Sequence, residues 1–407
     1  MKIDQNILMQ MRDTTRTLLA AGPHAATAAI QRALNGAQTM QVPKHDARVA
    51  PSGKAASGTQ TMAGPMADSM AGFVPDLLAK LRILMPAEGT PFDAPSFTPP
   101  GDISEAAAKT ATATGGRFIS GSFTNQAGTR QYKLYIPSCY KDKPLDKPLP
   151  LVVMLHGCTQ NPDDFANGTQ MNALAEEHQC LVVYPAQTQG ANSSKCWNWF
   201  NALDQKRDQG EPSIIAGITR KISEEYQVDS SRVYIAGLSA GGAMAAIMHA
   251  TYPDIYAAAG VHSGLAFGAA HDLPSALGAM RGGAAAGMPK LAAHAKVIPI
   301  IVFHGDRDKT VHPRNGDNIM SQSLSRLHGS SGIPDVIVQE GQSKHGQSYT
   351  CTMHRNSGGQ VIAEQWLLHG AGHAWSGGSK SGTYTDPAGP DAAQEMMRFF
   401  YSHSLPD

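Results

Sequence analysis

The sequence predicts an α/β fold whose core is a doubly wound, mainly parallel β-sheet covered by helices on both faces. From about residue 117 onward, apolar strand-like runs alternate with helix-like segments, the order typical of such sheets. Several runs, among them LVVML at 151–155 and IPIIVF at 298–303, are apolar throughout, as in strands buried on both faces. The chain has 407 residues, of which 42% are hydrophobic, which is enough for one sizeable core.

The expected strands are short runs of branched, aromatic and other apolar side chains bounded by turn residues. They lie at residues 117–123, 131–136, 151–155, 181–184, 232–236, 298–303, 336–338 and 362–368. The expected helices, which show apolar residues at helical spacing, lie at 164–179, 212–226, 240–252, 315–328 and 391–402. Because most of the later strands are separated by a helix, the sheet is expected to be mainly parallel.

The first part of the chain has a different composition and predicts an N-terminal extension, residues 1–115, ahead of a catalytic domain at 116–407. Apolar residues near helical spacing predict helices within 4–34. Residues 36–72 are rich in Gly, Ser, Ala, Thr and Met, and such a segment cannot bury enough surface to fold alone, so we expect a flexible linker. Residues 86–103 are rich in proline and are expected to be extended.

The charge balance argues against several classes of protein. Lys and Arg number 33, Asp and Glu also number 33, and an electrostatic nucleic-acid binder would be basic. No run reaches the roughly 18 apolar residues that a membrane span needs, and polar residues interrupt the N-terminus where a signal peptide would be apolar. Five cysteines with no C-x-x-C pair predict neither a disulfide scaffold nor a zinc site. A cytoplasmic protein without a metal is therefore expected.

A G-x-S-x-G motif at residues 237–241 places Ser239 between a predicted buried strand and a predicted helix. Such a turn lifts the serine oxygen clear of the sheet at the helix N-terminus, and the glycines relieve crowding. The alternative is an ordinary glycine-rich turn. The motif predicts Ser239 as a nucleophile, which needs a base and an acid to activate it.

An acid and a histidine follow in the order that α/β-hydrolases use, each just after a predicted strand. The acid is expected to be Asp308, which lies further into its loop than Asp306 and can turn toward the site; Asp306 can instead cap the turn. The base is expected to be His373, because His369 lies closer to the strand end. Together with Ser239 they predict a catalytic triad.

An oxyanion hole is expected from two backbone N–H groups. The early strand 151–155 is followed by His156, Gly157 and Cys158, where the N–H of Cys158 can point at a developing oxyanion. The second donor is the N–H of Ala240, the residue after the nucleophile. A plain turn after the strand is the alternative.

Aromatic residues near these segments suit an apolar wall for an acyl group. The expected substrate-binding residues are His156, Trp197, Asn198, Trp199 and Trp375. The alternative for each ring is that it closes the core. Cys158 and Cys196 could approach each other near the pocket, and whether they form a disulfide is left open, since disulfides are rare in cytosolic proteins.

The segments LHGCTQ, CWNWF, GLSAGGAM, HGDRD and GAGHAW occur in this order, and the chain over residues 115–405 resembles the polyhydroxybutyrate depolymerase family of esterases. The resemblance implies an α/β-hydrolase fold, a triad of Ser239, Asp308 and His373, and oxyanion donors at Cys158 and Ala240. The family contains secreted and intracellular polymer depolymerases and related feruloyl and acetylxylan esterases. The alanine-rich N-terminal extension resembles that of intracellular members.

The expected activity is therefore hydrolysis of the ester bonds of poly(3-hydroxybutyrate) or other polyhydroxyalkanoates through an acyl-enzyme, without a cofactor. One alternative keeps this chemistry for soluble feruloyl, acetyl, short-chain or aryl esters, or for synthetic polyesters. Another is a granule-surface binding protein anchored by amphipathic N-terminal helices. The expected partners are an ester substrate and the surface of polyhydroxyalkanoate granules, and the expected location is the cytoplasm, including that surface.

Overall fold

The structure is a computed structural model that describes residues 115–140, 147–283, 298–325 and 335–406. The helices expected within 4–34, the linker at 36–72 and the proline-rich segment at 86–103 lie outside the described residues. The N-terminal extension and its boundary with the catalytic domain therefore stay predictions.

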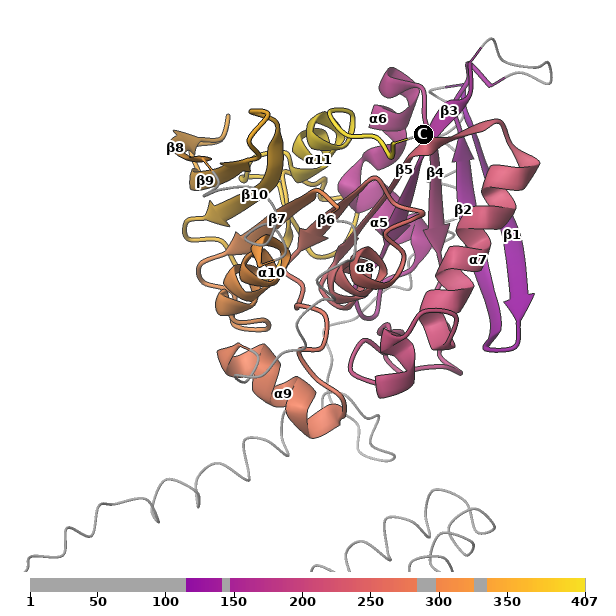
Figure 1. The fold of residues 1–407 in the computed structure, drawn as a ribbon, viewed down its shortest axis with the longest axis horizontal. Coiled ribbons are helices and arrows are strands. Elements are labelled where there is room, and N and C mark those ends of the chain that lie inside the picture. Colours follow the sequence, from indigo (N-terminus) through magenta and orange to yellow (C-terminus); the bar gives the residue numbers. More distant parts are fainter. Residues whose placement is uncertain (1–114, 141–146, 284–297, 326–334, 407) are drawn as a thin grey trace, which may run out of the picture. The chain divides into compact units, whose positions relative to one another are not determined.

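The core is a ten-stranded sheet with the order β1-β2-β4-β3-β5-β6-β7-β10-β9-β8 (Figure 1). The strands are β1 Arg117–Asn125, β2 Gly128–Ile136, β3 Leu149–Leu155, β4 Leu181–Pro185, β5 Val228–Leu238, β6 Ala258–His262, β7 Ile300–Gly305, β8 Asp335–Gln342, β9 Ser348–Arg355 and β10 Val361–Leu368. Neighbours from β4 to β10 pair parallel, and the strands at either end pair antiparallel. The expected doubly wound, mainly parallel sheet is confirmed.

Helices cover both faces of the sheet. They are α5 Pro162–Thr169, α6 Met171–His178, the 3₁₀ turn η1 Ala202–Gln205, α7 Gly210–Glu225, α8 Ala240–Thr251, α9 Leu273–Gly282, α10 Arg314–Leu324 and α11 Ala392–Phe400. One buried cluster joins α7, α8, α9 and α10 to the sheet, and the other joins α5, α6 and α11 to the opposite face. Successive side chains of a strand point to opposite faces of the sheet, so Val152 of β3 packs in one cluster and Val153 in the other.

The structure differs from the expected elements in a few places. The helix expected at 164–179 is two helices, because Gln170 adopts φ = 57° and interrupts it. The strands β6 and β9 and the helix α9 were not expected. The helix expected at 315–328 ends as α10 at Leu324, and residues 326–328 lie outside the described part.

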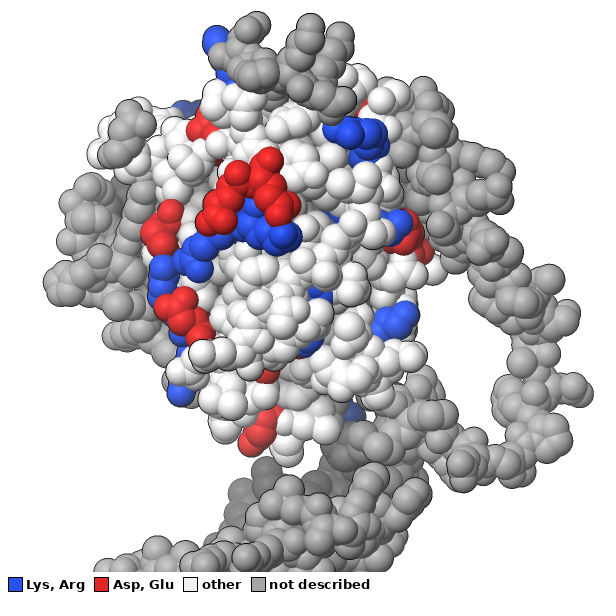
Figure 2. Space-filling view, turned by 90° about the vertical axis from the view of Figure 1, so that its right-hand side faces the viewer, with Lys and Arg blue, Asp and Glu red and all other residues white. Residues whose placement is uncertain are grey.

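A small second sheet lies after β10, where β11 (Trp375–Ser376) and β12 (Thr385–Asp386) pair parallel. On the side of the molecule where β1 and α7 lie, cationic and anionic side chains are interspersed over a mostly uncharged surface (Figure 2). This distribution agrees with the zero formal net charge of the chain. Among the described residues, no helix is long and apolar enough to span a membrane.

Candidate active site

Ser239 occupies a sharp turn between strand and helix. β5 ends at Leu238 and α8 begins at Ala240, so Ser239 alone makes the connection. Its backbone has φ = 57° and ψ = −119°, a strained combination for a residue with a side chain. Ser239 is partly exposed whereas both neighbours are buried, so the turn presents its hydroxyl at the surface. This is the geometry of a nucleophile elbow.

The glycines of the motif permit a close approach to the end of β3. A Cβ on Gly241 would collide with the carbonyl oxygen of Leu155, and a Cβ on Gly237 would lie 2.8 Å from the same oxygen. Because only glycine fits at both positions, the N-terminus of α8 packs directly on β3. The elbow therefore lies beside the loop that follows β3.

Asp308 and His373 lie on loops that follow β7 and β10, neighbouring parallel strands whose carboxyl ends share an edge of the sheet with the elbow. His373 Nδ1 is 2.6 Å from Asp308 Oδ2. Gly305, the last residue of β7, holds the two loops together, since a Cβ there would lie 2.7 Å from the carbonyl oxygen of Gly372. The structure thus brings together the expected acid and base.

The Asp308 carboxylate is fully buried and well supplied with donors. Its Oδ1 accepts the N–H groups of Thr310 and Val311, each at 2.8 Å, and its Oδ2 also lies 3.4 Å from His304 Nε2. Burial by itself raises the pKa of Asp308, but hydrogen bonds from His304, His373 and Val311 outweigh it and hold the pKa below its ordinary value. The carboxylate is therefore ionised and can hold the proton of His373 on Nδ1.

The other two candidates form a separate, more exposed pair. Asp306 Oδ2 lies 3.2 Å from His369 Nδ1, and Asp306 Oδ1 accepts the N–H of Gly370 at 2.7 Å. His369 Nε2 lies 2.8 Å from the hydroxyl of Thr350 on β9. Asp306 thus caps a turn, which was the alternative considered for it, and neither residue contacts Asp308 or His373 through a hydrogen bond in the described structure.

No hydrogen bond joins the Ser239 hydroxyl to His373 among the described contacts; such bonds often form only with substrate bound. His262 of β6 instead links the two segments. Its carbonyl oxygen accepts the Ser239 N–H at 2.9 Å, and its Nε2 accepts the Ser376 N–H at 3.0 Å. Burial, followed by the nearby histidines His304 and His373, lowers the pKa of His262 to about 3, so the ring stays neutral and can accept.

The loop after β3 lies against the elbow. A Cβ on Gly157 would lie 3.6 Å from the Ser239 Cβ. The next N–H, that of Cys158, has no hydrogen-bond partner in the described part of the chain. The N–H of Ala240 is the first of α8 and points from a helix N-terminus, where the dipole favours negative charge. Both groups are available to an oxyanion.

His156 supports this loop from below. Its Nε2 accepts the N–H of Gln187 at 3.1 Å, so Nδ1 carries the proton and donates to the carbonyl oxygen of Gly157 at 2.7 Å. Burial lowers its pKa to about 4, although the hydrogen bond to Gly157 opposes this shift. Because the C=O and N–H of a trans peptide point in opposite directions, the bond also fixes the direction of the Cys158 N–H.

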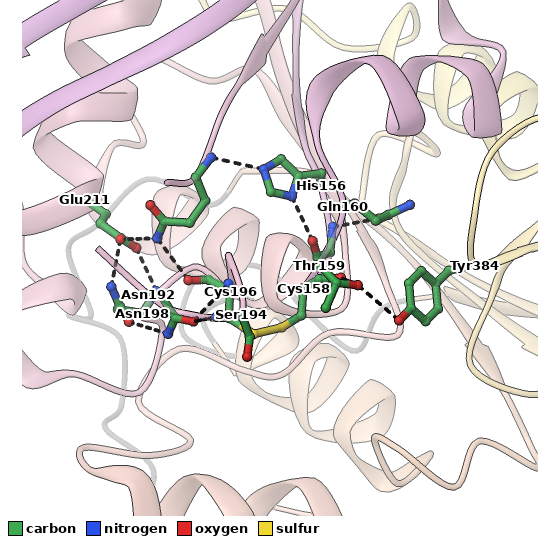
Figure 3. Close-up of a disulfide and its surroundings, with 12 residues drawn as sticks. His156, Cys158, Thr159, Gln160, Asn192, Ser194, Cys196, Asn198, Glu211 and Tyr384 are labelled. Carbon is green, nitrogen blue, oxygen red and sulfur yellow. Dashed lines mark hydrogen bonds between the residues drawn. A yellow bond between two sulfur atoms is a disulfide. The ribbon is translucent and has the colours of Figure 1, made fainter. Parts of the chain in front are cut away.

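A disulfide joins Cys158 to Cys196, with 4.2 Å between the Cα atoms (Figure 3). It resolves the pairing that the sequence left open and ties the loop after β3 to the segment that follows β4. The carbonyl oxygen of Cys196 also accepts a hydrogen bond from Gln187 Nε2 at 2.9 Å. Gln187 therefore contacts both segments that the disulfide joins: the loop after β3 through His156, and the segment after β4 through Cys196.

Glu211 anchors the same segment from the first turn of α7 (Figure 3). Its carboxylate accepts the side chain of Gln187, the N–H of Asn198 at 2.7 Å and the guanidinium of Arg130 at 3.1 Å. Sequence reasoning missed Glu211, Gln187 and Arg130, because their partners lie up to 81 residues away. An acidic residue in a first helical turn is usually explained by the helix dipole alone.

Four of the five expected substrate-binding residues are buried in the structure, and Asn198 is half-buried. Trp197 is 0% exposed, Trp375 is 1% exposed and His156 is 1% exposed. Burial of these side chains agrees with the alternative that they close the core and support the site. Their role in substrate binding stays a prediction. Trp199 is 6% exposed, and Asn198 bonds to Glu211, so both also contribute to the support.

A hollow of about 910 Å³ lies elsewhere, lined by residues of β1, the β1–β2 turn, the η1 region and α7, including Phe123, Leu203 and Arg220. None of the expected site residues lines it, so it is separate from the elbow. Within the described ranges, no cluster of three or more His, Cys, Asp or Glu could hold a metal ion.

Comparisons with known proteins agree with this geometry. Residues 130–356 match the family described as "Esterase PHB depolymerase". Over 278 residues the chain is 33% identical to poly(3-hydroxyalkanoate) depolymerase C of Paucimonas lemoignei, covering 66% of this chain and 62% of that protein. It is 30% identical to a probable acetylxylan esterase A of Neosartorya fischeri, covering 47% of this chain and 54% of that protein. The chain thus spans less than two thirds of these curated relatives.

Among solved structures, acetyl xylan esterase from Aspergillus awamori superposes with a TM-score of 0.54 at 20% identity, covering 70% of this chain and 99% of that one. At this identity the likeness concerns the fold. It agrees with the sheet order and the strand–serine–helix turn described above, and the fold is an α/β-hydrolase fold.

Proposed function

Because the chain belongs to the PHB depolymerase family of esterases, we propose that it is a serine ester hydrolase that cleaves polyhydroxyalkanoate through an acyl-enzyme. The observation that carries the proposal is the 2.6 Å contact between His373 and a buried Asp308 at the same sheet edge as the strained Ser239. Since the chain spans only part of its relatives, activity and substrate are both proposed here.

In the proposed mechanism, His373 Nε2 removes the proton of the Ser239 hydroxyl as the oxygen attacks an ester carbonyl. Asp308 holds the Nδ1 proton and stabilises the imidazolium that forms. The imidazolium then protonates the leaving alcohol, and His373 activates a water that hydrolyses the acyl-enzyme. Each step moves one proton through one imidazole.

The carbonyl oxygen gains negative charge during both steps. The N–H groups of Cys158 and Ala240 are the proposed donors, because each is unpaired and both flank the elbow. Donors held in advance need no reorganisation as the charge develops. A lost donor of this kind typically costs about 10²–10³ in kcat.

The polymer substrate is supported by the similarity to a protein named poly(3-hydroxyalkanoate) depolymerase C. A second candidate, hydrolysis of small acetyl or feruloyl esters, is favoured by the relatives named acetylxylan esterase and feruloyl esterase. Both candidates use the same triad, so only the substrate separates them.

The deciding experiment measures release of 3-hydroxybutyrate and its oligomers from amorphous poly(3-hydroxybutyrate) granules, beside hydrolysis of an aryl butyrate and of acetylated xylan. We expect the wild type to release 3-hydroxybutyrate and its oligomers from the granules. In Ser239→Ala, kcat on every substrate should fall by about 10⁶-fold, as for a removed nucleophile. Hydrolysis of the small esters without release from granules would favour the second candidate. Activity of Ser239→Ala near that of the wild type would refute the triad.

We also propose a cytoplasmic location that includes the granule surface, where such a substrate would lie. The disulfide between Cys158 and Cys196 is the observation that argues against a cytoplasmic location, because disulfides are typical of oxidising compartments. Fractionation of cells, combined with thiol labelling of Cys158 and Cys196, tests it. Recovery only outside the cytoplasm would contradict it.

A further inference from the structure

Gln160, the last residue of the LHGCTQ segment, is a side chain to which the proposed mechanism gives no role. It is 2% exposed and lies where the loop after β3 meets a distant part of the chain. Its Oε1 accepts the Gly157 N–H at 2.9 Å (Figure 3). Its Nε2 donates to Asp164 Oδ2 at 2.9 Å and to the carbonyl oxygen of Thr383 at 3.0 Å.

With the first of these contacts, both backbone polar groups of Gly157 are hydrogen-bonded to side chains. His156 holds the carbonyl oxygen of Gly157, and Gln160 holds its N–H. The two peptide planes that flank Gly157 are therefore both fixed, and one of them carries the Cys158 N–H. An oxyanion donor acts only if it is aimed where the charge appears, so these hydrogen bonds bear on catalysis directly.

The second contact reaches the segment that follows His373. Asp164 also accepts the Thr383 N–H at 2.8 Å, so Gln160 and Asp164 together hold this segment. The next residue, Tyr384, has a positive φ of 53°, and its hydroxyl lies 3.2 Å from that of Thr159. The Tyr384 carbonyl oxygen accepts the N–H of Trp375, two residues after His373. Gln160 thus lies between the oxyanion loop and the loop of the base.

We propose that Gln160 is a positioning residue of the oxyanion hole, which aims the Cys158 N–H and keeps the oxyanion loop in register with the loop that carries His373. The inference rests on the proposed function, since it assumes ester hydrolysis with Cys158 as a donor. Gln160 touches no reacting atom and acts through Gly157 at one end and Thr383 at the other.

The test compares an aryl butyrate with its thionoester, in which sulfur replaces the carbonyl oxygen and gains little from the oxyanion hole. In Gln160→Met, which keeps the length of the side chain and loses the hydrogen bonds to Gly157, Asp164 and Thr383, kcat for the ester should fall about 10- to 100-fold with KM within about twofold. The kcat for the thionoester should fall by less than about threefold. Equal losses on both substrates, or no loss on either, would overturn the proposal.

Gln205→Met is the matched control. Gln205 also clips a loop through both ends of its amide, accepting the Gly268 N–H and donating to the carbonyl oxygen of Ala270. In the described part of the chain the hydrogen bonds of the Gln205 side chain do not reach the oxyanion loop, so the ratio of ester to thionoester rates should stay within about twofold of the wild type. A change in that ratio as large as in Gln160→Met would overturn the proposal.

Gln160→Glu gives a second reading if the methionine variant does not fold. An ionised Glu at position 160 keeps the acceptor for the Gly157 N–H, but its charge repels that of Asp164, and this repulsion raises the pKa of the new Glu. A protonated Glu regains a hydrogen-bond donor for Asp164. The activity of Gln160→Glu relative to the wild type should therefore rise several-fold as pH falls from about 8 to 6. A ratio independent of pH would contradict the inference, whereas a wild type without esterase activity would refute the proposed function itself.

Discussion

Replacing Asp308 by asparagine tests the electrostatic centre of the site. Asparagine has nearly the same shape, and its Oδ1 can still accept the N–H groups of Thr310 and Val311. The amide nitrogen, however, takes the place of Oδ2, which lies 2.6 Å from His373 Nδ1. Two donors then face each other, so the histidine must carry its proton on Nε2, where it cannot accept the proton of Ser239.

The wrong tautomer costs about 10⁴-fold in kcat in the general case of a Ser-His-Asp triad, which corresponds to about 5.5 kcal/mol in the activation barrier. We expect Asp308→Asn to show a loss of this size on an aryl butyrate near pH 8. Thermal unfolding measured on the same samples checks that the fold is retained. A loss of less than about tenfold would refute the reasoning.

Asp306→Asn is the matched control for this prediction. Asp306 contacts His369 as Asp308 contacts His373, but at 3.2 Å and with the Asp306 side chain 34% exposed. Exposed pairs of this kind contribute little free energy. We expect kcat to change by less than about threefold, and an equal loss in both variants would show that the choice between the two carboxylates is wrong.

Three further predictions concern stability. Gly305→Ala places a Cβ 2.7 Å from the carbonyl oxygen of Gly372 and should cost about 1–3 kcal/mol in the free energy of unfolding measured with urea, with a fall in kcat because the loop that carries His373 shifts. An unchanged free energy of unfolding would contradict the close packing. Glu211→Ala leaves the buried Arg130 without its charged partner and should cost about 3–5 kcal/mol in the same measurement. A loss under about 1 kcal/mol would show that the pair does not anchor the loop. Burial lowers the pKa of His403 from 6.5 to about 4, so below pH 6.5 the unfolded chain binds a proton that the folded chain does not, and the free energy of unfolding falls as pH falls. Between pH 6 and 5, His403→Asn should lose about 1 kcal/mol less per pH unit than the wild type. Parallel curves of unfolding free energy against pH for the two proteins would contradict this.

Continuous apolar runs made the central strands predictable. β3 and β7 are buried along their whole length, and only a strand of a covered parallel sheet needs such a run. β6 escaped prediction because Ala258–His262 consists largely of small residues with little strand preference. β9 escaped because Ser348–Arg355 is mostly polar and half-buried. The break at Gln170 was invisible because its left-handed backbone is not carried by a glycine.

The site shows the same limit. Ser239, Asp308 and His373 could be chosen because each follows a strand in a fixed order along the chain. The support below them could not, because it depends on contacts between distant segments, such as Glu211 with Gln187. A pattern also favours a functional interpretation of any conspicuous residue: Trp375 is expected in an acyl-binding wall, with the core as the alternative, and in the structure it is 1% exposed and packs in the core. Burial is a property of the packed fold, and local sequence predicts it poorly for aromatic side chains.

The most direct test of the account is to identify the residue that becomes acylated during turnover. Wild-type protein reacting with an activated ester of 3-hydroxybutyrate is quenched in acid, digested and examined by mass spectrometry. The account predicts one 3-hydroxybutyryl group on the peptide that contains Ser239, with greatly reduced acylation in His373→Ala. Hydrolysis without any covalent adduct under burst conditions, or an adduct on another residue, would contradict it.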